Sequence, residues 1–163
     1  MKYSETDVLT IRNKQAEDAK RLINSRKARI SDAGAICKIS CHDLGYDCDE
    51  GLVKTKLQNL DDKREVVFVA ENNGKVTGYV HAEIYNTLYC EPLINILGLA
   101  VSSDFHRNGA GKRLMKEVES WAQEKGIGAV RLNSGISRKG AHEFYRRIGY
   151  DNEKQQIRFM KEL

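Results

Sequence analysis

The chain has 163 residues, enough for one domain at about 100–200 residues per domain. Apolar residues make up 40% of it and charged residues 31%, a balance that supports a buried core and excludes a wholly disordered chain. The formal net charge of +4 is spread along the chain and is too small to predict nucleic-acid binding. No apolar run approaches the roughly 18 residues of a membrane-spanning helix. These features predict a soluble globular protein with no nucleic-acid or membrane partner.

The cysteines and the first residues of the chain bear on its compartment. The start, MKYSETDVLT, lacks the basic and then apolar layout of a secretory signal, and four irregularly spaced cysteines without such a signal are typical of reduced thiols in the cytoplasm. Cys37, Cys41 and Cys48 match a zinc set only loosely, because zinc sites usually contain two closely spaced cysteine pairs. Cys37 and Cys41 stand four apart on a predicted helix, so we expect buried small side chains and no metal.

The first 25 residues allow two interpretations. Residues 9–24 and residues 25–39 each have the pattern of a strand, a turn and the start of a helix. Starting the domain with the second copy leaves no long structureless connection, which compact domains avoid. We therefore expect a helical N-terminal extension over residues 1–25 and one domain over residues 26–163. The domain would open with a strand at 26–30 and amphipathic helices at 32–43 and 49–60.

A hairpin and a central strand follow. Asn73-Gly74 separates two strand-like runs, residues 66–71 and 76–85, and this dipeptide strongly favours a two-residue hairpin turn. The second run alternates between an apolar face and a polar face. Residues 93–101 are almost wholly apolar, which is typical of a strand covered on both faces.

The period becomes helical after Gly109, and Gly126 is a natural end for that helix. Residues 129–133 have the pattern of a short strand. Ser137 can cap another helix that ends at Gly149, and residues 156–161 have the pattern of a last strand. Alternation of strands and helices predicts an α/β fold.

The segment LGLAVSSDFHRNGAGKRLM, residues 97–115, contains a strand, a glycine-rich loop and a helix start. Free N–H groups and the positive end of the helix dipole favour a phosphate or pyrophosphate at such a place. A Walker loop is excluded because His106 and Arg113 stand where it needs glycine and Ser or Thr, and the dinucleotide fingerprint is excluded because Leu114 stands at its third glycine.

The loop HRNGAG at 106–111 resembles the Gln/Arg-x-x-Gly-x-Gly/Ala loop of GCN5-related N-acetyltransferases, which binds the pyrophosphate of acetyl-CoA. The block AHEFYRRIGY at 141–150 is similar to that family's Ala-x-x-Phe-Tyr-x-x-x-Gly-Phe/Tyr block. The resemblance extends over about residues 26–163, with a weaker similarity to the aminoalkylphosphonate acetyltransferase branch. It implies a mixed, splayed β-sheet with helices on both faces, and acetyl-CoA as the acetyl donor.

The same resemblance implies a set of residues around acetyl-CoA. The end of the central strand would pair with the pantetheine arm, and the loop amides would hold the pyrophosphate. His106 departs from the Gln or Arg of the family, and Arg138 stands where relatives often carry asparagine. The implied set is Leu99, Ala100, Val101, His106, Arg107, Asn108, Gly109, Ala110, Gly111, Lys112, Arg138 and Tyr145.

Tyr145 matches the family tyrosine that hydrogen-bonds to or protonates the departing thiolate. A phenol with a pKa near 10 can donate a proton to a thiolate whose acid has a pKa near 8.5. On the residues alone, the competing interpretation is a core aromatic beside Phe144.

The base departs from the family pattern, because Asn95 stands where some relatives carry a catalytic glutamate. An amine with a pKa near 10.4 is only about one part in a thousand neutral at pH 7, so a group must remove its proton. Glu83, His81 and Glu91 are candidates, in that order. Each could instead be a solvated hairpin residue.

These inferences predict an N-acetyltransferase in which a substrate amine, preferably that of a small molecule, attacks acetyl-CoA directly. Many family members dimerise, so a homodimer is open. The alternatives are a catalytically silent CoA-binding module of the same fold, and a metal- or nucleic-acid-binding protein.

Overall fold

A computed structural model describes Thr10 and residues 23–163. Most of the expected N-terminal extension, residues 1–25, lies outside the described residues. The chain divides into two compact units, residues 1–132 and residues 133–163. None of the helices in the described part of the chain has the length and apolarity needed to cross a bilayer.

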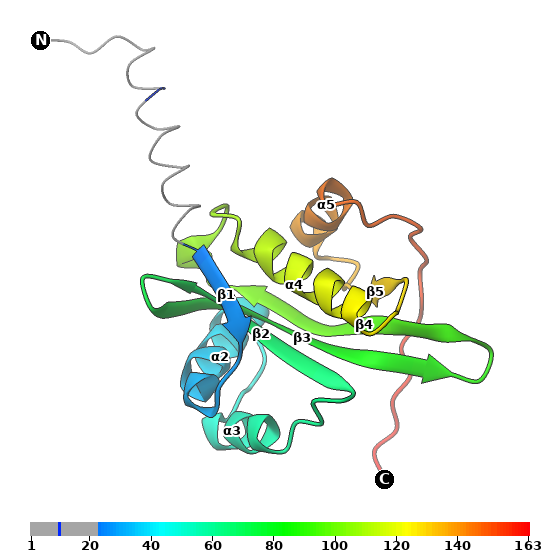
Figure 1. The fold of residues 1–163 in the computed structure, drawn as a ribbon, viewed down its shortest axis with the longest axis horizontal. Coiled ribbons are helices and arrows are strands. Elements are labelled where there is room, and N and C mark those ends of the chain that lie inside the picture. The colour runs from blue at the N-terminus through cyan, green and yellow to red at the C-terminus, as the bar shows by residue number, and fades with distance from the viewer. Residues whose placement is uncertain (1–9, 11–22) are drawn as a thin grey trace, which may run out of the picture. The chain divides into compact units, whose positions relative to one another are not determined.

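The first unit contains a five-stranded mixed sheet in the order β1-β2-β3-β4-β5 (Figure 1). Strands β1 to β4 are antiparallel neighbours, and β5 runs parallel to β4. The mixed sheet of the predicted α/β fold is confirmed. The strands are β1 (Ile23–Lys27), β2 (Glu65–Asn72), β3 (Lys75–Thr87), β4 (Cys90–Val101) and β5 (Val130–Leu132).

The hairpin turn at Asn73 and Gly74 forms as predicted. Both residues have positive φ, 50° and 77°, which a two-residue turn between antiparallel strands requires. Strand β1 begins three residues before the expected start at Arg26. It also ends at Lys27, three residues before the expected end at Ile30. Residues 28–30 leave the strand because Ile30–Asp32 form a short 3₁₀ turn and Arg26 pairs with Asp32.

Helices cover both faces of the sheet. On one face lie α2 (Ala33–Ile39), the π-type turn η2 (Ser40–Leu44) and α3 (Glu50–Gln58), and on the other lies α4 (Ala110–Glu124) (Figure 1). A hydrophobic core lies between the sheet and the helices of the first face. On the other face of the sheet, α4 buries an apolar stripe. The core residues of the first face are Ile36, Ile39, Val67, Val69, Tyr79 and Ala100. Those of α4 are Ala110, Leu114, Met115, Val118, Trp121 and Ala122.

The second unit contains the helix α5 (Lys139–Arg147). Gly149, with φ of 96°, follows the helix end as predicted. The prediction of Ser137 as the cap was wrong, because Arg138 occupies that position and makes no side-chain cap bond. The predicted strand at 156–161 was also wrong. Residues 151–163 are exposed and have no strand partner in the described part of the chain, so alternation alone does not form a strand there.

Candidate active site

Strand β4 is irregular at Leu97. Its register against β3 shifts there, and its pairing with β5 on the other edge ends one residue earlier, at Ile96. Leu97 is an extra residue opposite the step from His81 to Ala82, and it is 48% exposed. The ladder between β4 and β5 covers only Ile94 to Ile96. Beyond Ile96, the backbone edge of β4 therefore has no β5 partner among the described strands. An extended ligand could pair with this edge, which includes the predicted residues Leu99, Ala100 and Val101.

A glycine on β3 lets the backbone of β4 approach closely at its far end. Gly78 lies opposite Val101. A Cβ atom at Gly78 would stand 2.9 Å from the carbonyl oxygen of Ala100 and 3.1 Å from Cγ2 of Val101. Any larger residue would push β4 outward, so Gly78 fixes the position of the strand end that leads into the glycine-rich loop.

The loop between β4 and α4 turns through two left-handed residues. Arg107 has φ of 66° and Gly109 has φ of 88°, and α4 begins at the next residue, Ala110. This places the free N–H groups and the positive end of a 15-residue helix at the loop. A turn of this geometry can bind an anion, and the sequence predicts an anion site at this loop.

His106, the departure from the family loop, braces the end of β4. Its Nε2 lies 2.9 Å from the carbonyl oxygen of Val101. A carbonyl can only accept, so Nε2 carries the proton and donates. The ring thus links the strand end to the loop, which is a structural role for the side chain predicted to bind the cofactor.

Three basic side chains accompany the loop, and one of them is engaged elsewhere. Arg113 donates to Ser25 Oγ at 2.8 Å and lies 3.5 Å from Glu117. Arg107 and Lys112 are exposed and have no ion pair within the described residues. Two cations are therefore available to an anionic ligand at this turn.

A row of polar side chains crosses the sheet on the face that carries α2 and α3. Glu65 lies opposite Glu83, and Glu83 lies opposite Asn95, so these side chains share a face. His81, two residues before Glu83, shares it too, and its Nε2 lies 3.0 Å from Glu65 Oε2. Arg131 continues the row opposite Asn95. The residue pattern alone does not single out Glu65, whose place in the row follows from the strand register.

Asn95 binds the leading base candidate directly. Its Nδ2 donates to Glu83 Oε1 at 3.1 Å. Its Oδ1 is buried and has no hydrogen-bond partner among the described residues. An acceptor in that state favours a donor from a ligand or water. Glu91 lies within β4 rather than in a loop, four residues and about 13 Å along the strand from Asn95, and is exposed. It is the weakest of the three candidates.

In the second unit, Tyr145 packs between two aromatic rings. Its ring centroid lies 5.2 Å from that of Phe144 and 6.1 Å from that of Tyr150. Desolvation raises the pKa of Tyr145 above its usual value, against a smaller opposing effect of Arg138. The phenol therefore stays protonated at neutral pH, as a proton donor must. Arg138 stands at the N-cap of α5.

The cysteines differ from the expectation of buried side chains. Cys41 is exposed, and Cys37 and Cys48 are half-buried. Desolvation, together with hydrogen bonding to Cys48, raises the pKa of Cys37 to about 12. All four cysteines, including Cys90 in the hairpin, are free thiols.

Comparison with known proteins identifies the family. Residues 34–150 match the model of the Acetyltransferase (GNAT) family. The chain is 31% identical over 128 residues to an uncharacterized N-acetyltransferase of Chlorobaculum tepidum, covering 77% of this chain and 73% of that one. It is 26% identical over 152 residues to the aminoalkylphosphonate N-acetyltransferase of Salmonella typhimurium, covering 92% and 97%. The chain therefore belongs to the GNAT family and is an N-acyltransferase.

Solved structures agree with the fold. An aminoglycoside acetyltransferase from a soil metagenome, in complex with trehalose, superimposes with a TM-score of 0.74 at 22% identity, covering 88% of this chain and 97% of that one. An aminoglycoside acetyltransferase in complex with a CoA-linked bisubstrate analogue gives 0.74 at 16% identity, covering 86% and 99%. At such identities the likeness supports the fold alone.

Proposed function

We propose that the chain transfers an acetyl group from acetyl-CoA to a primary amine of a small molecule by direct attack. The observation that carries the proposal is the combination within one unit of an anion-binding turn, an unpaired strand edge and a carboxylate held by Asn95. The family supports acetyl transfer to amines, and the related structure with a CoA-linked analogue supports acetyl-CoA as the donor.

Acetyl-CoA would lie along the edge of β4 and the loop after it. The backbone of Leu99–Val101 would pair with the pantetheine arm, and the Leu99 N–H would polarise the thioester carbonyl. The amides from Arg107 to Lys112 would hold the pyrophosphate, because their backbone is turned by the left-handed Arg107 and Gly109. The side chains of Arg107 and Lys112 would add charge.

Glu83 is the proposed base. Its carboxylate is oriented by the Asn95 amide, and a second carboxylate, Glu65, stands opposite on the same face. This pair attracts an ammonium group, and Glu83 then takes one proton from it, directly or through a water. His81 is the second candidate, because its ring is held by Glu65 through one nitrogen and leaves the other available.

The neutral amine would attack the thioester carbon, the C–S bond would break, and the thiolate would take a proton from Tyr145. The support for Tyr145 is its place in the family block at 141–150 and a pKa raised by desolvation. Arg138 would contact the cofactor.

The acceptor is proposed to be a cationic small molecule. Two carboxylates, Glu65 and Glu83, and the buried acceptor Asn95 Oδ1 form a surface suited to ammonium groups. Similar proteins are named for aminoalkylphosphonates and aminoglycosides, both of which carry primary amines. Four free thiols favour a reducing compartment, so we place the reaction in the cytoplasm.

The test is release of CoA thiol from acetyl-CoA across a panel of aminophosphonates, aminoglycosides, polyamines and lysine peptides, with acetyl-CoA affinity measured in parallel by calorimetry. We expect turnover of at least one small amine by the wild type. The Glu83→Gln variant should lose turnover and keep its acetyl-CoA binding. Acetyl-CoA binding without turnover on any amine would instead identify a silent binding module.

A further inference from the structure

Three of the four cysteines come together outside the proposed active site. The Sγ atoms of Cys37, Cys41 and Cys48 all lie within 4.8 Å of one another. No other group of three His, Cys, Asp or Glu side chains in the described part of the chain gathers in this way. The acetyl-transfer chemistry proposed above uses none of these thiols, so the cluster needs its own explanation.

The local backbone brings these thiols together. Cys37 on α2 and Cys41 on η2 are four residues apart, which places them one above the other on the same face of a continuous helical segment. Gly45 ends this segment with φ of 74°, and the chain then turns back. The return brings Cys48 over the other two just before Asp49, which caps α3 through Leu52 N–H.

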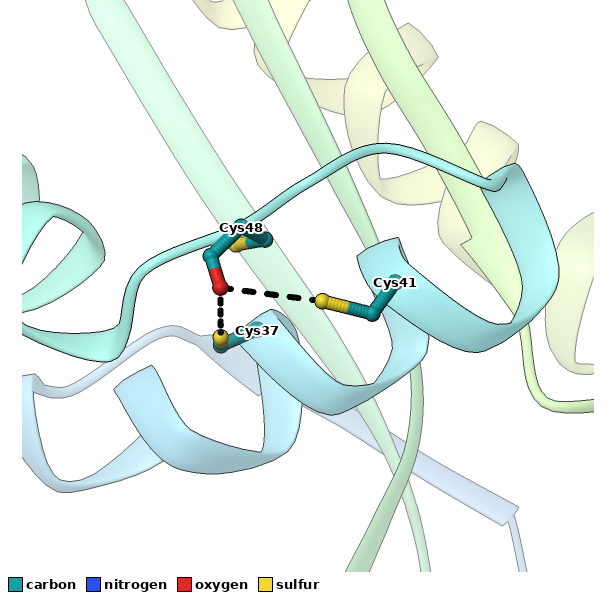
Figure 2. Close-up of side chains that lie close together, drawn as sticks. All are labelled: Cys37, Cys41 and Cys48. Carbon is teal, nitrogen blue, oxygen red and sulfur yellow. Dashed lines mark hydrogen bonds between the residues drawn. The ribbon is translucent and has the colours of Figure 1, made fainter.

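The thiols of Cys37 and Cys41 converge on one atom of Cys48, its main-chain carbonyl oxygen. Cys37 Sγ lies 3.1 Å and Cys41 Sγ 3.6 Å from the carbonyl oxygen of Cys48, so both S–H groups are directed toward the same atom (Figure 2). Three sulfurs around a metal at about 2.3 Å stand about 3.8 Å apart. The three Sγ atoms, which lie within 4.8 Å of one another, would close to that spacing on binding a metal.

From this geometry we infer that Cys37, Cys41 and Cys48 form a binding site for a thiophilic metal cation, Zn²⁺, that staples the turn between α2 and α3. On binding, the three thiols release their protons to solvent and three S–Zn bonds form. The exposed side at Cys41 leaves the fourth tetrahedral position to water. Asp47 and Asp49, on either side of Cys48, add negative charge nearby.

The identity of the metal follows from the ligands and the open side. Thiolates select soft or borderline ions such as Zn²⁺ and Cu⁺, and exclude Mg²⁺ and Ca²⁺, which require oxygen. A solvent-facing fourth position suits four-coordinate Zn²⁺ better than three-coordinate Cu⁺. The site lies on the α2–α3 connection, where Asp43 Oδ1 also accepts from Ser103 N–H at 2.8 Å, ahead of the glycine-rich loop.

The test uses the full chain, reduced and freed of metal, titrated with Zn²⁺ against a chromophoric chelator and with Co²⁺ as a spectroscopic probe. We expect one Zn²⁺ per chain, sulfur-to-cobalt charge-transfer absorption and a raised thermal midpoint with Zn²⁺. Cys41→Ser should weaken Zn²⁺ binding at least about tenfold, because it removes one of three ligands. Its side chain is exposed, so the fold should persist in this variant.

Cys90→Ser is the matched control. Cys90 is an exposed thiol in the β3–β4 hairpin, paired with Thr87 Oγ1 at 3.0 Å, and its loss should leave Zn²⁺ binding unchanged. Equal Zn²⁺ affinity in the wild type and Cys41→Ser would overturn the inference. So would a count of two free thiols instead of four in the Zn²⁺-treated chain, since the cluster would then hold a disulfide. Retention of Cu⁺ against a Cu⁺ chelator without retention of Zn²⁺ would overturn the zinc assignment.

Discussion

The amide of Asn95 donates to the carboxylate of Glu83 over 3.1 Å, across the ladder between β4 and β3. The family resemblance places a glutamate at the position of Asn95 in some relatives. The proposed base, Glu83, lies on the neighbouring strand and is held there by the Asn95 amide. The proposed base thus lies one strand away from the position that the resemblance implies, on the same face of the sheet.

Glu83→Gln tests the base itself. A positioned base typically contributes about 10²–10⁴-fold to the rate, so we expect kcat to fall at least about 100-fold with unchanged acetyl-CoA affinity. Glu91→Gln is the control, because Glu91 is exposed near the start of β4, and its rate should stay at the wild-type value. Steady-state kinetics decides the question: a Glu83→Gln variant with the wild-type kcat would rule Glu83 out as the base.

Asn95→Asp tests the positioning role through the pH profile. A second carboxylate next to Glu83 places like charges side by side, which disfavours the form with both carboxylates ionised. The base must be deprotonated to act, and the acid limb of kcat/KM should therefore move to higher pH. The measurement is the pH dependence of kcat/KM in both proteins. A loss of rate at every pH with no shift of the limb would assign Asn95 a purely structural role.

One local irregularity explains why the sequence did not predict the whole polar row. Counting back from the Asn73-Gly74 turn places Glu65 opposite Ala82, on the apolar face. A shift in register between Ala70 and Glu71 moves Glu65 opposite Glu83. Nothing in the residue pattern marks that bulge, and one added residue exchanges the two faces of a strand. The link from Glu65 to His81 was therefore invisible.

The turn at Asn73-Gly74 and the two ends of α4 were predictable because their signals are local. The Asn-Gly turn, Gly109 before α4 and Gly126 after it all adopt positive φ, where glycine and asparagine are favoured. The cysteine cluster was not predictable, because it depends on how sharply the chain returns after Gly45. The prediction of a strand at 156–161 was wrong because alternation of apolar and polar residues indicates only a tendency. A strand also needs a neighbouring strand to pair with.

Gly109→Val tests the anion-binding turn. Gly109 has φ of 88°, where a β-branched residue is strained by about 1–2 kcal/mol, so the loop should rearrange. We expect the acetyl-CoA Kd to rise at least tenfold in calorimetry, with little change in far-UV circular dichroism. Gly128→Val is the control, since a Cβ there meets nothing within 4 Å and its φ is not positive. Equal acetyl-CoA affinity in the two variants would argue against the loop as the pyrophosphate site.

Asp32→Asn tests a buried ion pair that supports the first unit. Asp32 is 6% exposed and accepts from Arg26 at 2.7 and 2.9 Å and from Arg29 N–H at 2.7 Å. Desolvation acts to raise the pKa of Asp32, but hydrogen bonding from Arg26 and Arg29 outweighs it and the pKa lies below its usual value. Breaking a buried pair costs about 3–5 kcal/mol at full burial, so we expect a loss of about 2–3 kcal/mol here, where Arg26 is partly exposed.

The sign of the pH effect follows from the lowered pKa. The stability that Asp32 contributes is present above its unfolded pKa and is lost as pH falls through its folded pKa. Urea unfolding should show a difference in the free energy of unfolding between the wild type and Asp32→Asn. This difference should be smaller at acidic pH than at neutral pH. Glu153→Gln, which removes an exposed partner of Arg146, is the control and should leave the midpoint unchanged. A difference that does not depend on pH would contradict the role of the Asp32 charge.

Tyr145→Phe tests the proton donor. The variant keeps the ring that packs on Phe144 and Tyr150 and removes only the hydroxyl, so the fold and the KM for acetyl-CoA should change little. The thiolate then leaves without a proton donor, and kcat should fall about 100-fold. Because desolvation raises the pKa of Tyr145 above its usual value, the phenol stays protonated well above neutral pH. The wild-type kcat should therefore have an alkaline limb far above neutral pH that is absent from the variant. An unchanged kcat across the pH range would return Tyr145 to the role of a core aromatic.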